Sequence, residues 1–244
     1  MNNKTIHYCW FGRGKKPELA KRCIASWHKF LPDYEIKEWN EDNFDIEIIP
    51  YTREAYEEKK YAFVSDYARF WILYHYGGVY FDVDVELIKP MNNIIERGPF
   101  MACENDELMH PFNLINPGLG IYADKEMPIY EELLKCYSQE HFLNDDKTLN
   151  LKTIVTRTTD VLIKHGYKPS NNIQEIAGLL IYPHDYMCPI RIVDGKKKIS
   201  QNTVSIHHYA ASWTTPRHRF LRGIIAACGG LKLRALLYRI IRKR

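Results

Sequence analysis

Two aspartates with one residue between them, Asp82 and Asp84, are the side chains in this sequence most suited to chemistry. Side chains alternate between the two faces of an extended chain, so both carboxylates point the same way and can face one cation. Hard oxygen ligands suit Mg²⁺ or Mn²⁺, which complete their shells with substrate phosphates and water. The pair indicates a metal-diphosphate site, although an isolated Asp-x-Asp is more often a solvated turn.

The preceding stretch favours the metal interpretation. Residues 61–76 are almost all apolar or aromatic, which predicts a helix that is buried on every side. Gly77 and Gly78 end this helix, and residues 79–81 begin a buried strand that leads into Asp82. In open α/β sheets, ligands bind beyond the carboxyl ends of such strands.

The predicted buried helix also carries two charged residues, Asp66 and Arg69. A spacing of three residues places them side by side on one helix face. They are therefore either an internal salt bridge or a contact for a substrate, and the residues alone leave both interpretations open.

Two segments in combination, SDYAR at residues 65–69 and GGVYFDVDVE at residues 77–86, resemble the DXD-containing sugar-binding region of the family 32 glycosyltransferases. That family includes bacterial capsular polysaccharide and O-antigen transferases and yeast mannosyltransferases, and it is related to the glucosylating domain of large clostridial toxins. The resemblance runs from IHYCWFG near the start to HHYAASW near Ser212. It implies an α/β fold of the GT-A type, a Rossmann-like nucleotide-sugar-binding domain with a mixed central sheet.

The resemblance implies roles for particular residues. Asp66 and Arg69 are expected to contact the donor sugar, Asp82 to join the ribose and metal shell, and Asp84 to bind the metal; these four form the expected catalytic set. Further contacts to the nucleotide-sugar are expected from Tyr8, Trp10, Asn40, Asn116, Ser212 and Trp213. Trp10 would stack on the base if it is not a core tryptophan, and Pro117 departs from the usual family pattern beside Asn116.

His207 and His208 lie together in a predicted strand, residues 203–209. Adjacent side chains in a strand point to opposite faces, so only one of these histidines can join the aspartates. The resemblance places His208 at a position that binds metal in related enzymes. The expected metal set is therefore Asp82, Asp84 and His208.

The composition is that of one ordinary globular domain. The 244 residues are 45% hydrophobic and 26% charged, enough for a single well-buried α/β domain, which we expect to span residues 1–215. Six cysteines without a CxxC pair indicate reduced thiols. Residues 12–15, GRGK, lack the spacing of a phosphate-binding P-loop. The sequence shows neither a leader peptide nor an apolar run of spanning length, so a cytoplasmic location is expected.

The last residues differ from the rest in charge. Residues 217–244 contain nine Lys or Arg and no acidic residue, which leaves 25 basic and 30 acidic side chains in residues 1–216, a balance of −5. Beyond Gly229 and Gly230, an apolar helical stripe is formed by Leu233, Leu236, Leu237 and Ile240. A basic amphipathic helix in the tail, residues 216–244, fits an anionic membrane surface, or it packs on the domain with a solvated basic face.

The resemblance implies a metal-dependent retaining glycosyltransferase. It would use Mn²⁺ or Mg²⁺ to move a hexose or N-acetylhexosamine from a nucleotide-sugar, with UDP favoured, to a lipid-linked or growing surface saccharide. An α-linkage is expected, together with a peripheral location on the inner face of the cell membrane. Nucleic acid is not an expected partner, because no motif supports it.

Two alternatives remain open. An apolar strand that ends in DxDx also begins haloacid-dehalogenase-type phosphohydrolases, with the first aspartate, here Asp82, as the nucleophile; Glu86, however, stands where Thr or Val is expected. The other alternative is a non-catalytic module that binds carbohydrate or membrane. No motif names the donor sugar, the acceptor, the linkage or the oligomeric state.

Overall fold

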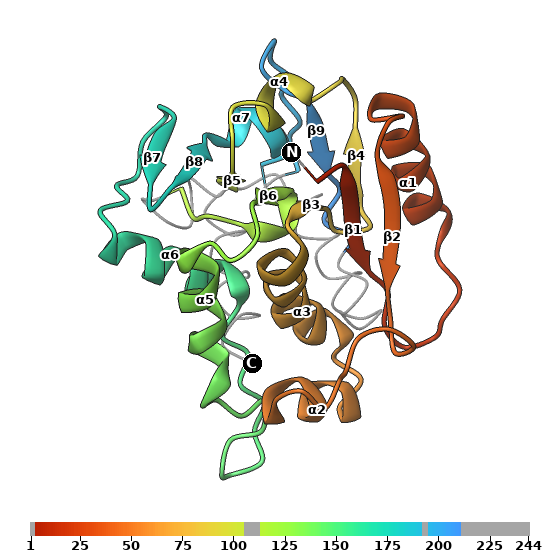
Figure 1. The fold of residues 1–244 in the computed structure, drawn as a ribbon, viewed down its shortest axis with the longest axis vertical. Helices are drawn as coiled ribbons and strands as arrows, with labels where there is room; N and C mark the ends of the chain where they lie inside the picture. Colours follow the sequence, from red (N-terminus) through yellow and green to blue (C-terminus); the bar gives the residue numbers. More distant parts are fainter. Residues whose placement is uncertain (1–2, 105–112, 192–194, 211–244) are drawn as a thin grey trace.

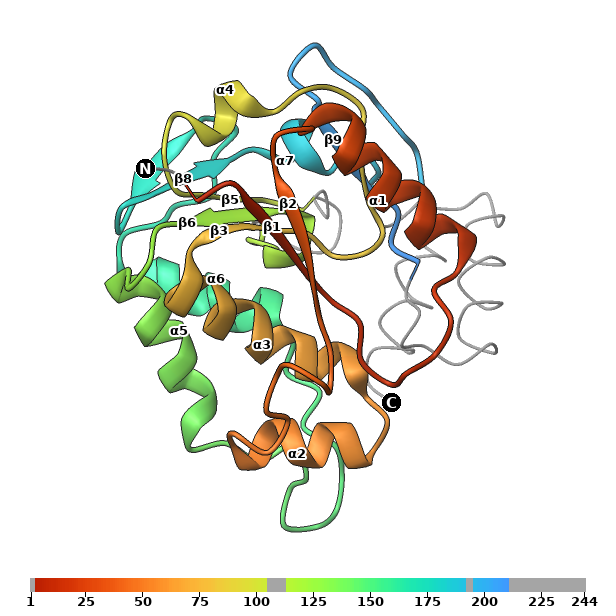
Figure 2. The ribbon, with the colours of Figure 1, turned by 45° about the vertical axis from the view of Figure 1, so that its right-hand side comes forward.

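The computed structural model describes residues 3–104, 113–191 and 195–210. Within these ranges the chain forms a central seven-stranded mixed sheet with helices on both faces (Figures 1 and 2). The strands run in the order β2-β1-β3-β6-β5-β8-β7. Their bounds are β1 Thr5–Cys9, β2 Glu35–Trp39, β3 Gly78–Tyr80, β5 Phe100–Ala102, β6 Ile121–Ala123, β7 Gln174–Ile176 and β8 Leu179–Tyr182. A separate antiparallel pair consists of β4 Val85–Leu87 and β9 Ser205–His207.

The helices divide the hydrophobic core into two layers, one on each face of the sheet (Figure 2). One layer contains α2 Pro50–Glu57, α3 Tyr61–Tyr76, α5 Pro128–Ser138 and α6 Ile154–Lys164. The other contains α1 Glu18–Phe30, α4 Asn92–Ile95 and α7 His184–Met187, together with β4. The helices bury their apolar faces within these two layers, with α2 packing on α3 and α5, and this burial is the main force that holds such layers together.

Strand direction brings several loops to one edge of the sheet. β1, β2 and β3 are mutually parallel, and β5 and β8 are parallel to each other. β6 is antiparallel to both β3 and β5, so β3 and β5 also run the same way. The carboxyl ends of β1, β2, β3, β5 and β8 therefore meet at a single edge, the carboxyl edge, where ligands bind in sheets of this kind.

The predicted helix and strand around the aspartate pair are confirmed. α3 spans the predicted residues 61–76, and β3 follows directly. Gly77 separates the two elements, and Gly78, the first residue of β3, has φ +96°; a Cβ on Gly78 would come within 2.7 Å of the Thr5 carbonyl oxygen. Only glycine fits this junction, because it combines a left-handed backbone with close contact to β1.

Residues 114–122 do not form one continuous strand. Asn116 caps a 3-10 turn, η1 Pro117–Leu119, before β6 begins at Ile121. Proline lacks the N–H that a ladder needs and has the φ of a helical turn, so the turn interrupts the strand. β7 pairs with β8 but was not predicted from the sequence. The predicted tail helix lies outside the described residues, as does the boundary expected near residue 215.

Five cysteines of the described ranges are free thiols, in agreement with the reduced state expected from their spacing. Among the helices of the described ranges, none has the combination of length and hydropathy that crossing a bilayer requires.

His7 is a buried histidine in the middle of β1. Its Nδ1 accepts a hydrogen bond from the Trp39 indole N–H at 3.1 Å, and its Nε2 lies 3.0 Å from the Gly77 carbonyl oxygen. With Nδ1 accepting and Nε2 donating, the ring is neutral. Burial lowers the pKa of His7 to about 4. The Lys37 charge also lowers this pKa, while the Gly77 hydrogen bond acts in the opposite direction.

We expect this histidine to make folding sensitive to mild acid. Below pH 6.5 the unfolded chain binds a proton at His7 that the folded chain rejects, so the free energy of unfolding should fall by about 2 kcal/mol between pH 7.5 and pH 5 from this group. Urea unfolding of the wild type and His7→Asn at both pH values isolates the effect, since Asn offers an acceptor but does not titrate. The difference in free energy of unfolding between the wild type and His7→Asn should shrink at pH 5. A difference that is the same at both pH values would contradict the lowered pKa of His7.

Candidate functional site

Asp82 and Asp84 lie in the short connection between β3 and β4, at the carboxyl edge of the sheet. The β4 end of this connection is attached to α1 by two hydrogen bonds. The Trp27 indole N–H donates to the Val85 carbonyl at 2.8 Å, and the Leu87 N–H donates to the Ser26 hydroxyl at 2.9 Å. The two aspartates are thus held between the central sheet on one side and the α1 layer on the other.

Arg69 connects the buried helix to the first aspartate. Its Nη2 lies 2.9 Å from Asp66 Oδ1 and 3.2 Å from Asp82 Oδ1. Its Nη1 donates a hydrogen bond to Asp82 Oδ2 at 3.3 Å. The Tyr80 hydroxyl donates to Asp82 Oδ1 at 3.1 Å. Asp66 and Arg69 form the internal ion pair that was one of the two interpretations, and Arg69 also contacts the DXD segment. A contact of this pair with a substrate stays a prediction.

Burial shapes the ionisation of this group. It raises the pKa of Asp66 to about 7, because the Arg69 charge offsets only part of the cost of a buried carboxylate and the negative Asp82 adds to it. Burial opposes the charge on Arg69 too, but the carboxylates of Asp82 and Asp66 and the Tyr80 hydroxyl raise the pKa of its guanidinium. The arginine is therefore a fixed positive charge beside the first aspartate.

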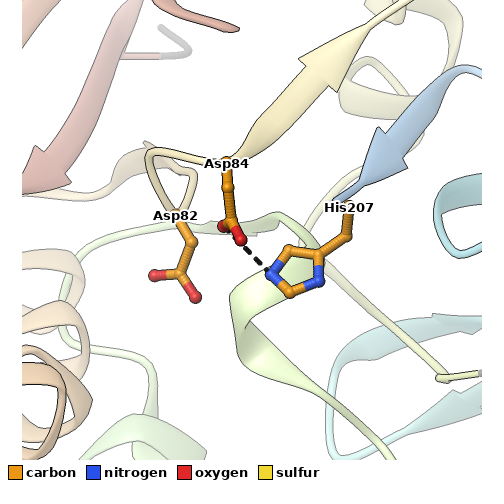
Figure 3. A group of neighbouring side chains, drawn as sticks. All are labelled: Asp82, Asp84 and His207. Atoms are coloured by element: carbon orange, nitrogen blue, oxygen red, sulfur yellow. Dashed lines mark ion pairs between the residues drawn. The ribbon is translucent and has the colours of Figure 1, made fainter. Parts of the chain in front are cut away.

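Asp84 faces a histidine from a distant part of the chain. His207 Nε2 lies 3.2 Å from Asp84 Oδ1, and Asp82 is beside them (Figure 3). β9 carries His207 to this place by pairing antiparallel with β4, opposite Val85. The second oxygen of Asp84 accepts the Ala210 backbone N–H at 2.8 Å, which ties the end of β9 to the same carboxylate.

The Asp84 carboxylate is stabilised in its charged form. Burial alone would raise its pKa, but the charge and hydrogen bond of His207 and the Ala210 N–H outweigh this and lower the pKa to about 2. For His207, burial opposes the charge, while Asp84 raises the pKa of the imidazole above its usual value. The Asp84 carboxylate is therefore held in its ionised form beside the imidazole of His207.

The three side chains fit a divalent ion. One ligand atom from each of Asp82, Asp84 and His207 lies within 4.8 Å of the others. Octahedral bonds of about 2.2 Å place ligands about 3 to 4.4 Å apart, so small side-chain adjustments let all three hold one ion. Two carboxylates with one imidazole suit Mn²⁺ well, because Mn²⁺ prefers oxygen ligands and also accepts nitrogen.

His208, the histidine expected in this cluster, has a different partner. Its Nε2 lies 2.7 Å from Glu86 Oε2, and its backbone N–H donates to the Asp84 carbonyl. Only one histidine of the pair joins the aspartates, as strand alternation requires. That histidine is His207, so the expectation of His208 is corrected. In the β4-β9 register Glu86 stands opposite Ile206, on the face that His208 shares, whereas His207 lies on the buried face.

Asn116 lies next to the aspartates but its amide is used internally. Its Oδ1 accepts the Gly118 N–H at 2.8 Å and its Nδ2 donates to Glu104 at 2.9 Å. Gly118 touches Asp82 so closely that a Cβ would lie 2.3 Å from Asp82 Oδ2. Asn116 therefore shapes the turn beside the site, and its expected contact to the sugar stays a prediction.

The residues expected to bind the nucleotide form a second group at the ends of β1 and β2. The Tyr8 hydroxyl donates to Glu38, and the Asn40 amide donates to the same carboxylate at 3.1 Å. Trp10 is half-buried at the end of β1, and its indole N–H donates to the Gly14 carbonyl. Within the described ranges no hydrogen bond or ion pair joins this group to Asp82, and Ser212 and Trp213 lie outside those ranges.

The sequence prediction missed three residues of this region: Glu38, Glu104 and His207. Glu104 follows β5 as Asp82 follows β3, so the rule that selected the aspartates also applies to it. Glu38 precedes Asn40 by two residues and could have been found from strand alternation. His207 required the β4-β9 register, which local sequence does not specify.

A comparison with protein families matches residues 17–101 to the model described as "Glycosyltransferase sugar-binding region containing DXD motif". The match spans α1 to β5 and includes Asp66, Arg69, Asp82 and Asp84. This part of the chain is glycosyltransferase-like. The matched region holds the carboxylates and the arginine described above, while His207 comes from outside it.

Similar proteins have been characterised or solved. Inositol phosphoceramide mannosyltransferase 1 of Schizosaccharomyces pombe is 33% identical over 109 residues, which cover 40% of this chain and 33% of the relative, so the match spans about a third of that relative's length. The solved PaToxG glycosyltransferase has a TM-score of 0.51 at 17% identity, covering 67% of this chain and 69% of that one. A glycosyltransferase involved in glycosylation of the major capsid of PBCV-1 has a TM-score of 0.49 at 12% identity, with 90% and 98% covered. The PaToxG likeness confirms the GT-A type of α/β fold with a mixed central sheet.

The two histidines can be separated by metal binding alone. We expect His207→Ala to weaken Mn²⁺ binding more than about tenfold, since losing even an outer partner of a metal ligand costs that much. His208→Ala should bind Mn²⁺ nearly as the wild type does, because its imidazole is occupied by Glu86. Isothermal titration with Mn²⁺ measures both, and equal loss in the two variants would refute the assignment of His207.

Proposed function

We propose that this protein is a metal-dependent retaining glycosyltransferase that transfers a hexose or N-acetylhexosamine from a nucleotide-sugar, with UDP favoured, to a saccharide acceptor. The observation that carries the proposal is the joining of two sites at the carboxyl edge. A cation cluster of Asp82, Asp84 and His207 shares Asp82 with the buried Arg69 and Asp66. A nucleoside diphosphate with a sugar attached needs these two neighbouring sites, one for its phosphates and one for its sugar.

The residues have separate tasks in this proposal. Asp84, Asp82 and His207 would hold Mn²⁺ or Mg²⁺, which supplies positive charge against the departing diphosphate. Arg69 keeps Asp82 fixed and gives the sugar side of the site a permanent positive charge. Asp66 binds donor-sugar hydroxyls, which orients the anomeric carbon for attack.

The chemistry balances without a protein nucleophile. The bond between C1 of the sugar and the β-phosphate oxygen breaks, the acceptor hydroxyl oxygen bonds to C1 from the same face, and its proton passes to the departing phosphate oxygen. The anomeric configuration is retained, so an α-linked donor yields an α-glycosidic bond. The chain's part is to orient the donor and to stabilise the negative charge that develops on the leaving group.

One relative supports transfer of a sugar to a lipid-linked acceptor. The matching yeast protein is named as a mannosyltransferase for inositol phosphoceramide, and this name supports a hexose donor and an acceptor on a lipid. The second group of residues, Tyr8, Trp10 and Asn40, is proposed to bind the nucleotide, and growing surface saccharides are proposed as further acceptors.

A donor panel tests the activity directly. Hydrolysis and transfer from UDP-glucose, UDP-galactose, UDP-N-acetylgalactosamine and GDP-mannose would be measured with and without Mn²⁺ for the wild type and Asp84→Ala. We expect Mn²⁺-dependent turnover of one donor, reduced at least about a hundredfold in the variant. Asp124→Ala, an exposed carboxylate at the opposite end of the strands, is the matched control and should keep full activity.

The alternatives predict other outcomes of the same panel. Hydrolysis of phosphate monoesters with a covalent phosphate on Asp82 would favour the phosphohydrolase. Donor or saccharide binding without any turnover would favour a carbohydrate-binding module. Either result would overturn the proposed transfer.

We also propose that the protein works on the inner membrane surface, through the basic tail at residues 216–244. Each Lys or Arg near an anionic bilayer contributes about 1 kcal/mol, so replacing Lys232, Arg239 and Lys243 by Gln should weaken binding to anionic vesicles about a hundredfold. Co-sedimentation with anionic and with neutral vesicles measures this, alongside deletion of residues 217–244. Unchanged binding in both variants would contradict the membrane role.

A further inference from the structure

Glu104 is a buried carboxylate at the carboxyl edge, directly after β5. Only 7% of the residue is exposed, and burial of a carboxylate requires partners that compensate the loss of water. One partner is Asn116, whose Nδ2 donates to Glu104 Oε2 at 2.9 Å. The position of Glu104 relative to β5 is that of Asp82 relative to β3, on strands that run in the same direction.

Glu104 reaches Asp82 through a short chain of contacts. Asn116 Oδ1 accepts the Gly118 N–H at 2.8 Å, so a single amide connects Glu104 to the η1 turn. Gly118 lies against Asp82 Oδ2, and the Gly118 carbonyl oxygen accepts a hydrogen bond from the Asp82 backbone nitrogen at 3.4 Å. The contact between Gly118 and Asp82 leaves no space even for a Cβ on the glycine. A displacement of the Asn116 amide would therefore push the η1 turn against the Asp82 carboxylate.

His207, in the other half of the metal cluster, is positioned separately from these contacts. Its Nε2 faces Asp84, and its buried Nδ1 has no hydrogen-bond partner among the described residues. Outer partners of metal ligands change metal affinity 10–100-fold, so contacts behind Asp82 alone can affect the cluster.

We propose that Glu104 is a positioning residue for the metal cluster, holding Asp82 in place through Asn116 and Gly118. This inference rests on the proposed function, since it requires the cation site. It assigns to Glu104 a role in metal affinity, not a contact with the substrate, and it predicts that the hydrogen bond to Asn116 matters more than the number of charges nearby.

A polarity exchange separates the hydrogen bond from the charge. Asn116→Asp keeps an acceptor for the Gly118 N–H but places a carboxylate against Glu104, and Glu104→Gln removes the charge while keeping an acceptor for Asn116. In the double variant the Gln amide donates to the new Asp, so the hydrogen bond returns with reversed polarity and the net charge equals that of the wild type. The probe is Mn²⁺ alone, titrated at pH 8 into the full chain, with thermal unfolding as a check on folding.

If positioning dominates, Asn116→Asp binds Mn²⁺ about tenfold more weakly than the wild type despite its extra negative charge, and the double variant recovers most of the affinity. Glu104→Gln alone is weakened to a smaller extent, because the Gln oxygen still accepts the hydrogen bond from Asn116. Glu131→Gln, the same substitution on exposed α5, is the control and leaves Mn²⁺ affinity unchanged.

The opposing results are distinct. Mn²⁺ affinity that rises in Asn116→Asp and falls in Glu104→Gln, with no recovery specific to the pair, would show that charge alone acts and would overturn the positioning role. Unchanged affinity in all three variants would also overturn it, with the proposed transferase left intact. A wild type that binds no Mn²⁺ would overturn the metal site itself, and this inference with it.

Discussion

The enclosure of Arg69 between Asp66 and Asp82 is the interaction on which the site depends. The guanidinium is almost completely buried, so its charge is compensated by the two carboxylates, by the Ser65 carbonyl that accepts from Nε, and by the Tyr80 ring. Loss of one partner from a buried ion pair costs about 3–5 kcal/mol, which makes the arrangement of all three groups mutually dependent. The buried helix α3 and the connection after β3 are joined by this interaction, and the first aspartate of the DXD pair has a defined orientation as a result.

The second aspartate depends on a different layer. Asp84 meets His207 because β4 leaves the central sheet, packs on α1 and pairs with β9, which lies more than a hundred residues later. The metal cluster therefore stands where two layers of the protein meet, with Asp82 oriented from the α3 layer and Asp84 from the α1 layer. Either half alone offers too few ligands to hold a divalent ion firmly.

Local patterns predicted the centre of this arrangement well. A continuous apolar helix, two glycines and a short apolar strand leave few alternatives, and α3 and β3 lie where the pattern indicated. Asp66 and Arg69 are neighbours because helical spacing requires it. The 3-10 turn at Pro117 and the strand β7 were not predicted, since short strands derive their stability from partners in the sheet rather than from their own residues.

The sequence by itself determined which residues could form the acidic site and that one of two adjacent histidines would complete it, because helix and strand periodicities are local properties. The tertiary structure decided that His207, not His208, faces Asp84, and that Glu104, Asn116 and Gly118 stand behind Asp82. Strand register and the order of strands in a sheet are set by packing between distant segments. A shift of one residue in register would exchange the two histidines, and nothing in their immediate sequence distinguishes them.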